Sequence, residues 1–176
     1  MTARLAFWVL LGATLVVYSF LIFIFGPRLA DAAGGLPVFD LRIGGYTFEE
    51  AKAFLMALTS EGREIYLGPV RIIDTIFPGL LAATLYCALV VLLRPWLGNN
   101  ARYVALLPIV PAVLDWLENA AVAALLRAGA DGITPEMVAT ASRWTVLKWW
   151  TDIPVLLGTL ILALMAGWRR WKARGA

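Results

Sequence analysis

The stretch LAFWVLLGATLVVYSFLIFIF, residues 5–25, contains no charged residue and sets the environment in which the rest of the chain has to fold. A helix needs about 20 predominantly apolar residues to cross a membrane, whereas the apolar core of a signal peptide has roughly 7–15. The Ala30-Asp31-Ala32 sequence resembles a signal-peptide cleavage site, but the apolar stretch is too long for a signal core. We therefore predict that residues 5–26 form a retained first membrane helix.

The composition of the whole 176-residue chain agrees with a membrane environment. Apolar residues make up 61% of the chain and charged residues 15%, compared with roughly 25% charged residues in ordinary soluble domains. The mean hydropathy is +0.80. A soluble domain of this size exposes too much surface to hide so many apolar side chains, so the composition excludes a water-soluble enzyme. Disorder is excluded as well, because disordered chains combine low hydrophobicity with high net charge.

The chain has no histidine and only one cysteine, Cys87. These counts exclude histidine-ligated metal centres, histidine general bases, disulfide bonds and CxxC redox sites. A Gly-rich phosphate loop, a GxSxG turn and an HExxH helix are also missing from the sequence. We therefore expect no cofactor and no bound metal ion. We also expect no nucleic-acid partner, because the basic residues do not form a face on a soluble part.

Three further segments are long and apolar enough to be membrane helices. The second helix follows a Gly-Pro pair, which is typical of a helix start, and covers residues 70–94. The third covers residues 103–126 and the fourth covers residues 144–168. The sequence therefore predicts a single membrane domain, residues 1–176, that folds as an all-α four-helix bundle. The alternative is a three-helix protein whose last segment lies on the membrane surface.

The basic residues predict the orientation of these helices, because cytoplasmic segments of membrane proteins are enriched in Lys and Arg. Two segments, residues 28–74 and 127–143, contain acidic and basic residues together. Apart from Lys148, the basic residues elsewhere fall before the first helix, around the turn between the second and third, and after the fourth: Arg4, Arg94, Arg102, Arg169, Arg170, Lys172 and Arg174. We therefore predict that both termini are cytoplasmic and that the protein lies in a bacterial cytoplasmic membrane.

Residues 27–68 are predicted to form a structured outer loop. Thr47 and Glu50 have the spacing of a capping box, so a short amphipathic helix should begin there and end at Gly62. The alternating residues 38–43 predict a short extended piece before it. This helix either rests on the mouth of the bundle or in the headgroup layer, or it forms a lid or a docking surface for another protein.

Charged residues inside the third and fourth predicted helices need partners, because a charge at membrane depth is costly. Asp115, Glu118 and Asn119 share one face of the third helix, and Lys148 and Asp152 share one face of the fourth. Glu118 and Asp152 both lie roughly 12 Å from the outer ends of their helices. We therefore predict a network centred on Lys148 that includes Glu118, Asp152 and also Asp115.

Three more polar residues are candidates for an entrance to this network. Tyr18 lies on the first helix, and Arg71 and Asp74 lie near the outer end of the second. The network itself has three carboxylates for one lysine, so desolvation and repulsion favour a proton on at least one carboxyl group. Such a group of residues can be a structural clamp, a ligand or ion site, or a catalytic site.

The function expected from these features is that of a non-enzymatic accessory or interaction protein in a membrane. One alternative is a small binder or carrier of a lipid-like ligand, a proton or a cation through Asp115, Glu118, Lys148 and Asp152. A second alternative is an intramembrane enzyme that uses the same carboxylates as acid and base. The expected partners are the lipid bilayer and either another membrane protein or a second copy of the chain.

Overall fold

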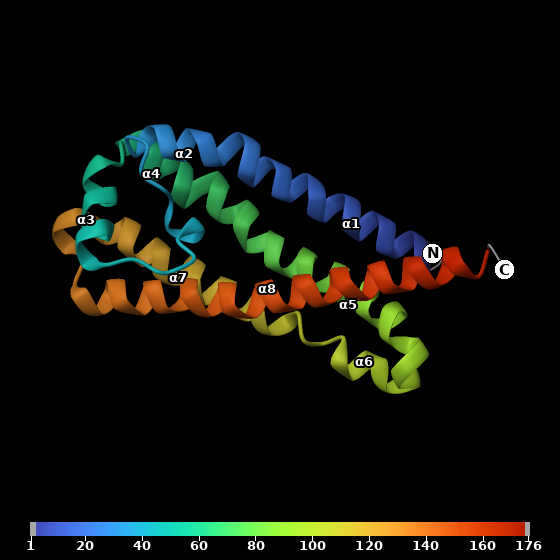
Figure 1. Cartoon of the computed structure of the whole chain (residues 1–176). Coiled ribbons are helices and arrows are strands. Elements are labelled where there is room, and N and C mark those ends of the chain that lie inside the picture. Colours follow the sequence, from blue (N-terminus) through green and yellow to red (C-terminus); the bar gives the residue numbers. More distant parts are fainter. Residues whose placement is uncertain (1–2, 175–176) are drawn as a thin grey trace.

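The computed structural model describes residues 3–174, which are mainly helical and contain no strand (Figure 1). The predicted domain covers residues 1–176, of which residues 1–2 and 175–176 lie outside the described part. In chain order the helices are α1 (Ala3–Ser19), the wide π-helical turn η1 (Phe20–Phe25), α2 (Gly26–Ala32), the 3₁₀ turn η2 (Phe39–Leu41), α3 (Phe48–Ala57), α4 (Ser60–Ile65), the π-helical turn η3 (Tyr66–Val70), α5 (Arg71–Leu97), the 3₁₀ turn η4 (Gly98–Asn100), α6 (Ala101–Val104), α7 (Ile109–Gly132) and α8 (Pro135–Lys172).

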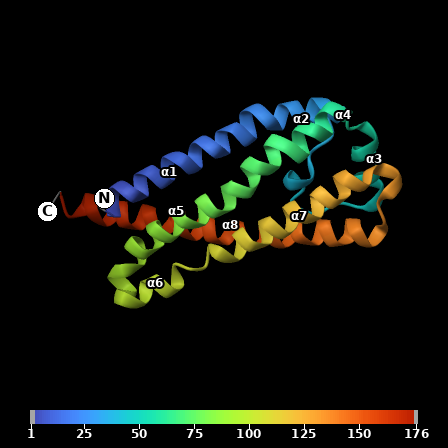
Figure 2. The ribbon, with the colours of Figure 1, turned by 180° about the vertical axis from the view of Figure 1, so that it is seen from behind.

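Three helical stretches of the described chain are long and apolar enough to cross a membrane, namely Leu5–Ala32, Ser60–Gly132 and Pro135–Lys172. The second stretch is not straight: after α5 the chain turns through η4 and α6, and α7 returns beside α5 (Figures 1 and 2). The last stretch, which the three-helix alternative places on the membrane surface, is itself long enough to cross.

Two widened helical turns lie at prolines: η1 comes just before Pro27, and η3 contains Pro69. Pro27 and Pro69 have no amide hydrogen, and their rings clash with the carbonyl group four residues earlier in a regular helix. The chain responds with the wide turns η1 and η3, and the Gly26 amide donates to the carbonyl oxygen of Leu21 five residues back. The first helical stretch therefore continues past the predicted end at residue 26 as far as Ala32.

The predicted capping box at the start of α3 is confirmed. The Thr47 amide donates to Glu50 Oε2 (2.7 Å), and the Glu50 amide donates to Thr47 Oγ1 (3.2 Å). The predicted end of this helix at Gly62 is wrong, because α3 ends at Ala57 and a new helix, α4, begins after its own cap, Thr59. Gly62 lies inside α4, where its missing side chain lets the backbone pack closely against Ala32.

The extended piece predicted for residues 38–43 is also wrong, because residues 39–41 form the 3₁₀ turn η2. The Arg42 guanidinium donates two hydrogen bonds to the Pro37 carbonyl oxygen and so closes the turn on itself. After η2, Gly45 adopts a positive φ of 83° and lies against Ser142 on α8. The Tyr46 amide then donates to Ser142 Oγ (2.8 Å), which fastens the outer segment to α8.

The bounds of α7 and α8 differ from the predicted ranges 103–126 and 144–168. α7 begins only after a turn at residues 105–108 and runs on to Gly132. α8 begins at Pro135, where the Thr134 hydroxyl accepts a hydrogen bond from the Met137 amide (3.3 Å). Most of the predicted loop at 127–143 is therefore helix.

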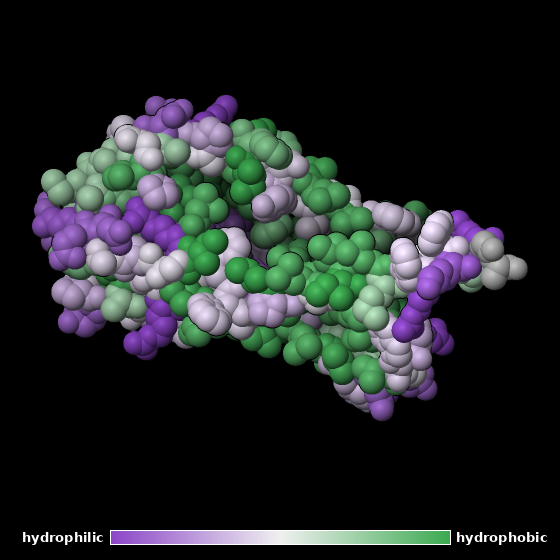
Figure 3. Space-filling model, in the orientation of Figure 1, coloured by the Kyte–Doolittle hydropathy of each residue, from purple (hydrophilic) through white to green (hydrophobic). Residues whose placement is uncertain are grey.

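The main hydrophobic core lies at one end of the molecule, which we call the outer end after the orientation predicted from the sequence. Side chains of α2, η2, α3 and η3 meet the last turns of α7 and the first turns of α8 there; the largest buried ones include Phe39, Phe54, Tyr66, Leu125, Leu126 and Val138. Figure 3 shows hydrophilic residues at both ends of the molecule and hydrophobic residues across the middle. Many large apolar side chains in the middle are exposed, among them Leu157, Leu160 and Leu164 of α8.

Candidate functional site

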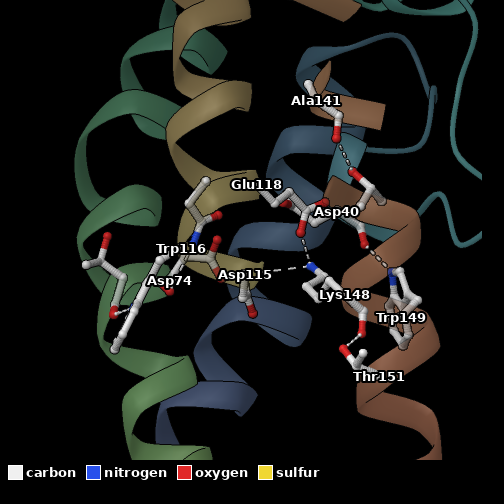
Figure 4. Close-up of polar contacts among 12 residues, drawn as sticks. Asp40, Asp74, Asp115, Trp116, Glu118, Ala141, Lys148, Trp149 and Thr151 are labelled. Carbon is white, nitrogen blue, oxygen red and sulfur yellow. Dashed lines mark hydrogen bonds and ion pairs between the residues drawn. The ribbon is translucent and has the colours of Figure 1, made fainter. Parts of the chain in front are cut away.

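Lys148 on α8 contacts Glu118 on α7 in the interior of the molecule (Figure 4). Only 9% of the lysine side chain and none of the glutamate side chain is exposed. The two residues are brought together because α7 and α8 pack side by side as neighbours joined by a short connection. The sequence predicts this contact as part of a network centred on Lys148.

Asp115 lies one turn from Glu118 on the same face of α7, and its Oδ1 atom is 3.8 Å from Lys148 Nζ. Asp115 Oδ1 and Glu118 Oε1 are both buried, and neither accepts a hydrogen bond from the described part of the chain. A buried acceptor without a donor costs about 1–3 kcal/mol, and more when it is charged. The two carboxyl groups are therefore short of hydrogen-bond donors.

Asp152 takes a different place from the predicted one. It lies one turn from Lys148 on α8, but no ion pair joins the two residues within the described chain. Asp152 instead lines a small cavity with Asp115, between α5, α7 and α8. The cavity has a volume of about 10 Å³, and its other walls are apolar and include Pro78 and Pro111.

Asp40 on η2 joins the site, although the sequence gives no direct reason to include it. Its Oδ2 atom accepts a hydrogen bond from the Tyr66 hydroxyl (2.6 Å), and its carbonyl oxygen accepts one from Trp149 Nε1 (2.9 Å). Trp149 directly follows Lys148, so η2 lies over the outer side of the ion pair (Figure 4). The signal in the sequence is a carboxylate between two large apolar residues, Phe39 and Leu41.

A second buried tyrosine of the outer segment, Tyr46, packs near this turn. Its ring lies against Phe39, with 4.8 Å between the ring centroids. Burial raises the pKa of its hydroxyl well above the usual value, and the nearby carboxylates of Glu118 and Asp40 add to the rise. The Tyr46 hydroxyl therefore stays neutral at physiological pH, and its buried side chain lines the site.

The predicted entrance residues do not all reach the site. Tyr18 is exposed on α1 and stacks on Phe77 of α5, with 5.6 Å between the ring centroids. Asp74 lies on the α5 side of Asp115, and its carbonyl oxygen accepts a hydrogen bond from Asn119 Nδ2 (3.3 Å) (Figure 4). Asn119 therefore ties α7 to α5 and does not belong to the lysine contacts.

Arg71, the third predicted entrance residue, lies in the first turn of α5 and is half-buried. Its Nη1 atom is buried and donates no hydrogen bond to the described residues. The structure does not place Arg71 in an ion pair with Asp74, although the two are three residues apart.

We call Asp40, Asp74, Asp115, Glu118, Lys148 and Asp152 the carboxylate–lysine cluster. It gathers five carboxyl groups from η2, α5, α7 and α8 around one ammonium group. No group of three or more Cys, Asp or Glu side chains in residues 5–174 is placed to hold a metal ion. Comparison with protein-family models, with curated proteins and with solved structures finds no match to this chain. What the cluster can bind therefore has to follow from its own chemistry.

Proposed function

We propose that this chain is an integral protein of a bacterial cytoplasmic membrane that crosses the bilayer four times as a four-helix bundle. The crossing helices are α1 with α2, then α5, α7 and α8. α5 has 27 residues and is roughly 40 Å long, and the regular part of α7 before the kink at Gly129, residues 109–128, is roughly 30 Å long. A bilayer core is about 30 Å thick, which either helix can cross. The apolar middle and hydrophilic ends in Figure 3 support this placement.

The charge distribution supports cytoplasmic termini. The end of the molecule that holds α6 and both termini carries basic residues and no acidic ones in residues 75–114 and 153–174 (Figure 1). The opposite end, with α2, α3 and α4, carries mixed charges. Because short cytoplasmic loops are enriched in Lys and Arg, we infer that the basic end faces the cytoplasm.

We propose further that the carboxylate–lysine cluster binds a proton. The observation that carries this proposal is the pair of buried oxygens, Asp115 Oδ1 and Glu118 Oε1, that lack a hydrogen-bond donor. Lys148 balances only one of these two carboxylates, and an unbalanced charge at this depth is costly. A proton held between them or on one of them neutralises the second charge and supplies the missing donor. The remaining carboxyl groups of the cluster, from η2, α5 and α8, increase the preference for a proton.

The size of the cavity favours a proton over a larger ligand. Sites for organic ligands have volumes of about 300–1,000 Å³, whereas the cavity between Asp115 and Asp152 measures about 10 Å³. That is close to the smallest space that holds one water molecule. The cluster therefore has no room for a lipid-like ligand or an organic substrate, and we place the protein among non-enzymatic membrane proteins.

Infrared spectroscopy of the reconstituted protein tests the proton site, because a protonated buried carboxyl group has its own C=O stretching band, which shifts in D₂O. We expect this band near neutral pH, with a reversible loss at higher pH while the helical content stays constant. Asp115→Asn and Glu118→Gln should each weaken or shift the band. Glu136→Gln, which changes an exposed carboxylate in the first turn of α8, is the matched control and should not.

Two results would overturn the proton site. One is the absence of the band near neutral pH, which means that all cluster carboxylates are ionised. The other is a band that persists unchanged at every pH at which the protein stays folded, because the cluster would then be a structural clamp that does not release its proton.

A further inference from the structure

A shallow hollow of about 770 Å³, widely open to its surroundings, lies along the C-terminal part of α8, and side chains of residues 163–171 of this one helix line it. Its walls are mostly apolar and include Leu164, Met165 and Trp168, with Arg169 as the only charged lining residue. Gly167 also faces the hollow, and no atom lies within 4 Å of the position that a side chain would take there. The hollow therefore combines a long apolar wall with one fixed cation at its end.

Aromatic rings hold the cations at this end of the molecule. The Arg169 guanidinium lies 4.8 Å from the ring centroid of Trp96, on the last turn of α5. Lys172 Nζ lies 5.4 Å from the ring centroid of Trp168. The sequence has no acidic residue after Asp152, so these cations have no carboxylate nearby along α8. Their natural partner is an anion from outside the chain.

We propose that this hollow is a binding site for one anionic phospholipid of the cytoplasmic leaflet. The acyl chain lies along Leu164 and Met165, and the phosphate group pairs with Arg169. A guanidinium forms two parallel hydrogen bonds with a phosphate, and Trp side chains prefer the depth at which headgroups lie. This site is independent of the proton site and rests on the proposed membrane placement and orientation of the chain.

A specific lipid-binding site differs from general attraction to an anionic membrane surface in one testable way. General attraction is worth about 1 kcal/mol for each basic residue near the surface, whichever residue it is. Arg170 is adjacent to Arg169 but points roughly 100° away around the helix and does not line the hollow. The variants Arg169→Gln and Arg170→Gln therefore remove the same charge at almost the same place, and only the first removes it from the hollow.

The experiment measures lipid binding to the purified full chain in detergent by native mass spectrometry, with phosphatidylglycerol and phosphatidylcholine as probes. We expect one tightly held phosphatidylglycerol on the unchanged protein and on Arg170→Gln. Arg169→Gln should weaken its binding about tenfold or more, as expected for the loss of a charge-assisted hydrogen bond. Inorganic phosphate should not displace the lipid, because it lacks the acyl chains.

A second pair of variants keeps every charge in place. Gly167→Leu fills the hollow and should also weaken the binding of phosphatidylglycerol, whereas Gly158→Leu, at another open position of α8, should not. Equal losses in Arg169→Gln and Arg170→Gln would overturn the proposal, as would equal binding of phosphatidylcholine. Unchanged binding in Gly167→Leu would overturn the proposal too. This variant still tests the proposal if Arg169→Gln fails to fold, because it adds a side chain only at an open surface position.

Discussion

The ammonium group of Lys148 on α8 contacts the carboxylate of Glu118 on α7, and the glutamate side chain is fully buried. This contact joins the two helices that pack most extensively against each other. It also brings a cation to the point where η2 covers the interior, beside Trp149 and Asp40. The stability of the outer half of the molecule should therefore depend on this pair.

Removal of one partner of this pair should be far more harmful than removal of both. Lys148→Met leaves Glu118 buried without a cation, and breaking a buried ion pair in this way costs about 3–5 kcal/mol. The double variant Lys148→Met with Glu118→Gln leaves no buried charge in the pair and should recover most of that loss. Unfolding of the four proteins of this cycle in detergent measures the coupling. Simple additivity of the two single losses would contradict the buried pair.

A hydrogen bond between threonine hydroxyls links α1 to α5. Thr14 Oγ1 and Thr84 Oγ1 are 2.9 Å apart and buried. Such contacts between membrane helices contribute about 0.6 kcal/mol on average. We expect Thr14→Val to lower the free energy of unfolding by about this amount. Thr75→Val is the control, because the Thr75 hydroxyl bonds only to the Arg71 carbonyl of its own helix. An equal loss in both variants would mean that the link between helices contributes nothing of its own.

The capping box of α3 should make the outer segment sensitive to acid. The hydrogen bond from the Thr47 amide lowers the pKa of Glu50 below its ordinary value of 4.5. A carboxylate with a lowered pKa stabilises the folded state above that ordinary value, and the contribution is lost as the pH falls through the lower, folded-state pKa.

Glu50→Ala should therefore make the α3 amides exchange faster near neutral pH, because it removes the acceptor of the Thr47 amide. Hydrogen exchange measures this loss, and the difference from the unchanged protein should shrink as the pH falls through the folded-state pKa of Glu50. Glu49→Ala removes a charge from the same turn without touching the box and is the control. A Glu50→Ala effect that stays constant with pH would contradict the role of ionised Glu50.

Gly62 should not tolerate a larger side chain. A Cβ atom there would lie 2.6 Å from the Ala32 Cβ atom and 2.8 Å from Leu58 Cδ1. Overpacking of this kind costs about 1–3 kcal/mol, so Gly62→Val should lower the melting temperature. Gly44→Val, at a position with open space around it, should leave the melting temperature nearly unchanged. A Gly62→Val protein as stable as the Gly44→Val protein would show that α4 does not pack on α2 as described.

The proposed orientation predicts which parts of the chain can be reached from each side. A tag at the C-terminus should be accessible only from the cytoplasm, because the last turns of α8 carry the basic residues. A tag inserted in the exposed turn at Gly34 and Gly35 should be accessible only from outside the cell. Labelling of intact and opened cells measures both, and an outward C-terminus would contradict the topology.

Local patterns in the sequence predict the helices and the cap of α3 well, because both depend on neighbouring residues. The ends of the helices are harder to predict. Hydropathy detects only the apolar part of a helix, whereas α7 and α8 continue past Arg127 and Arg143 into the polar outer end. The 3₁₀ turn at Phe39 could not be predicted from alternation, because its shape depends on burial against Phe54 and Tyr46.

The centre of the site follows from depth along the helices, since Glu118 and Asp152 have the same predicted depth on antiparallel neighbours and Lys148 is one turn from that level. The place of Asp152 does not follow in this way, because the lysine side chain leans across to α7 and not along its own helix. The contacts of Asp40 could not be predicted, because its position between Phe39 and Leu41 is the one signal that the sequence offers. Its contact with Trp149 joins residues 109 positions apart, and it exists only after the outer segment has folded onto α8.

The core at the outer end has a consequence for the order in which the protein matures. Its residues come from two distant parts of the chain, 29–70 and 122–141. The earlier part leaves the ribosome long before its packing partners, so Phe39, Phe54 and Tyr66 remain uncovered until α7 and the start of α8 have been synthesised. Closure of this core is thus a late step of folding, and a chain that stops before α7 leaves these apolar side chains exposed.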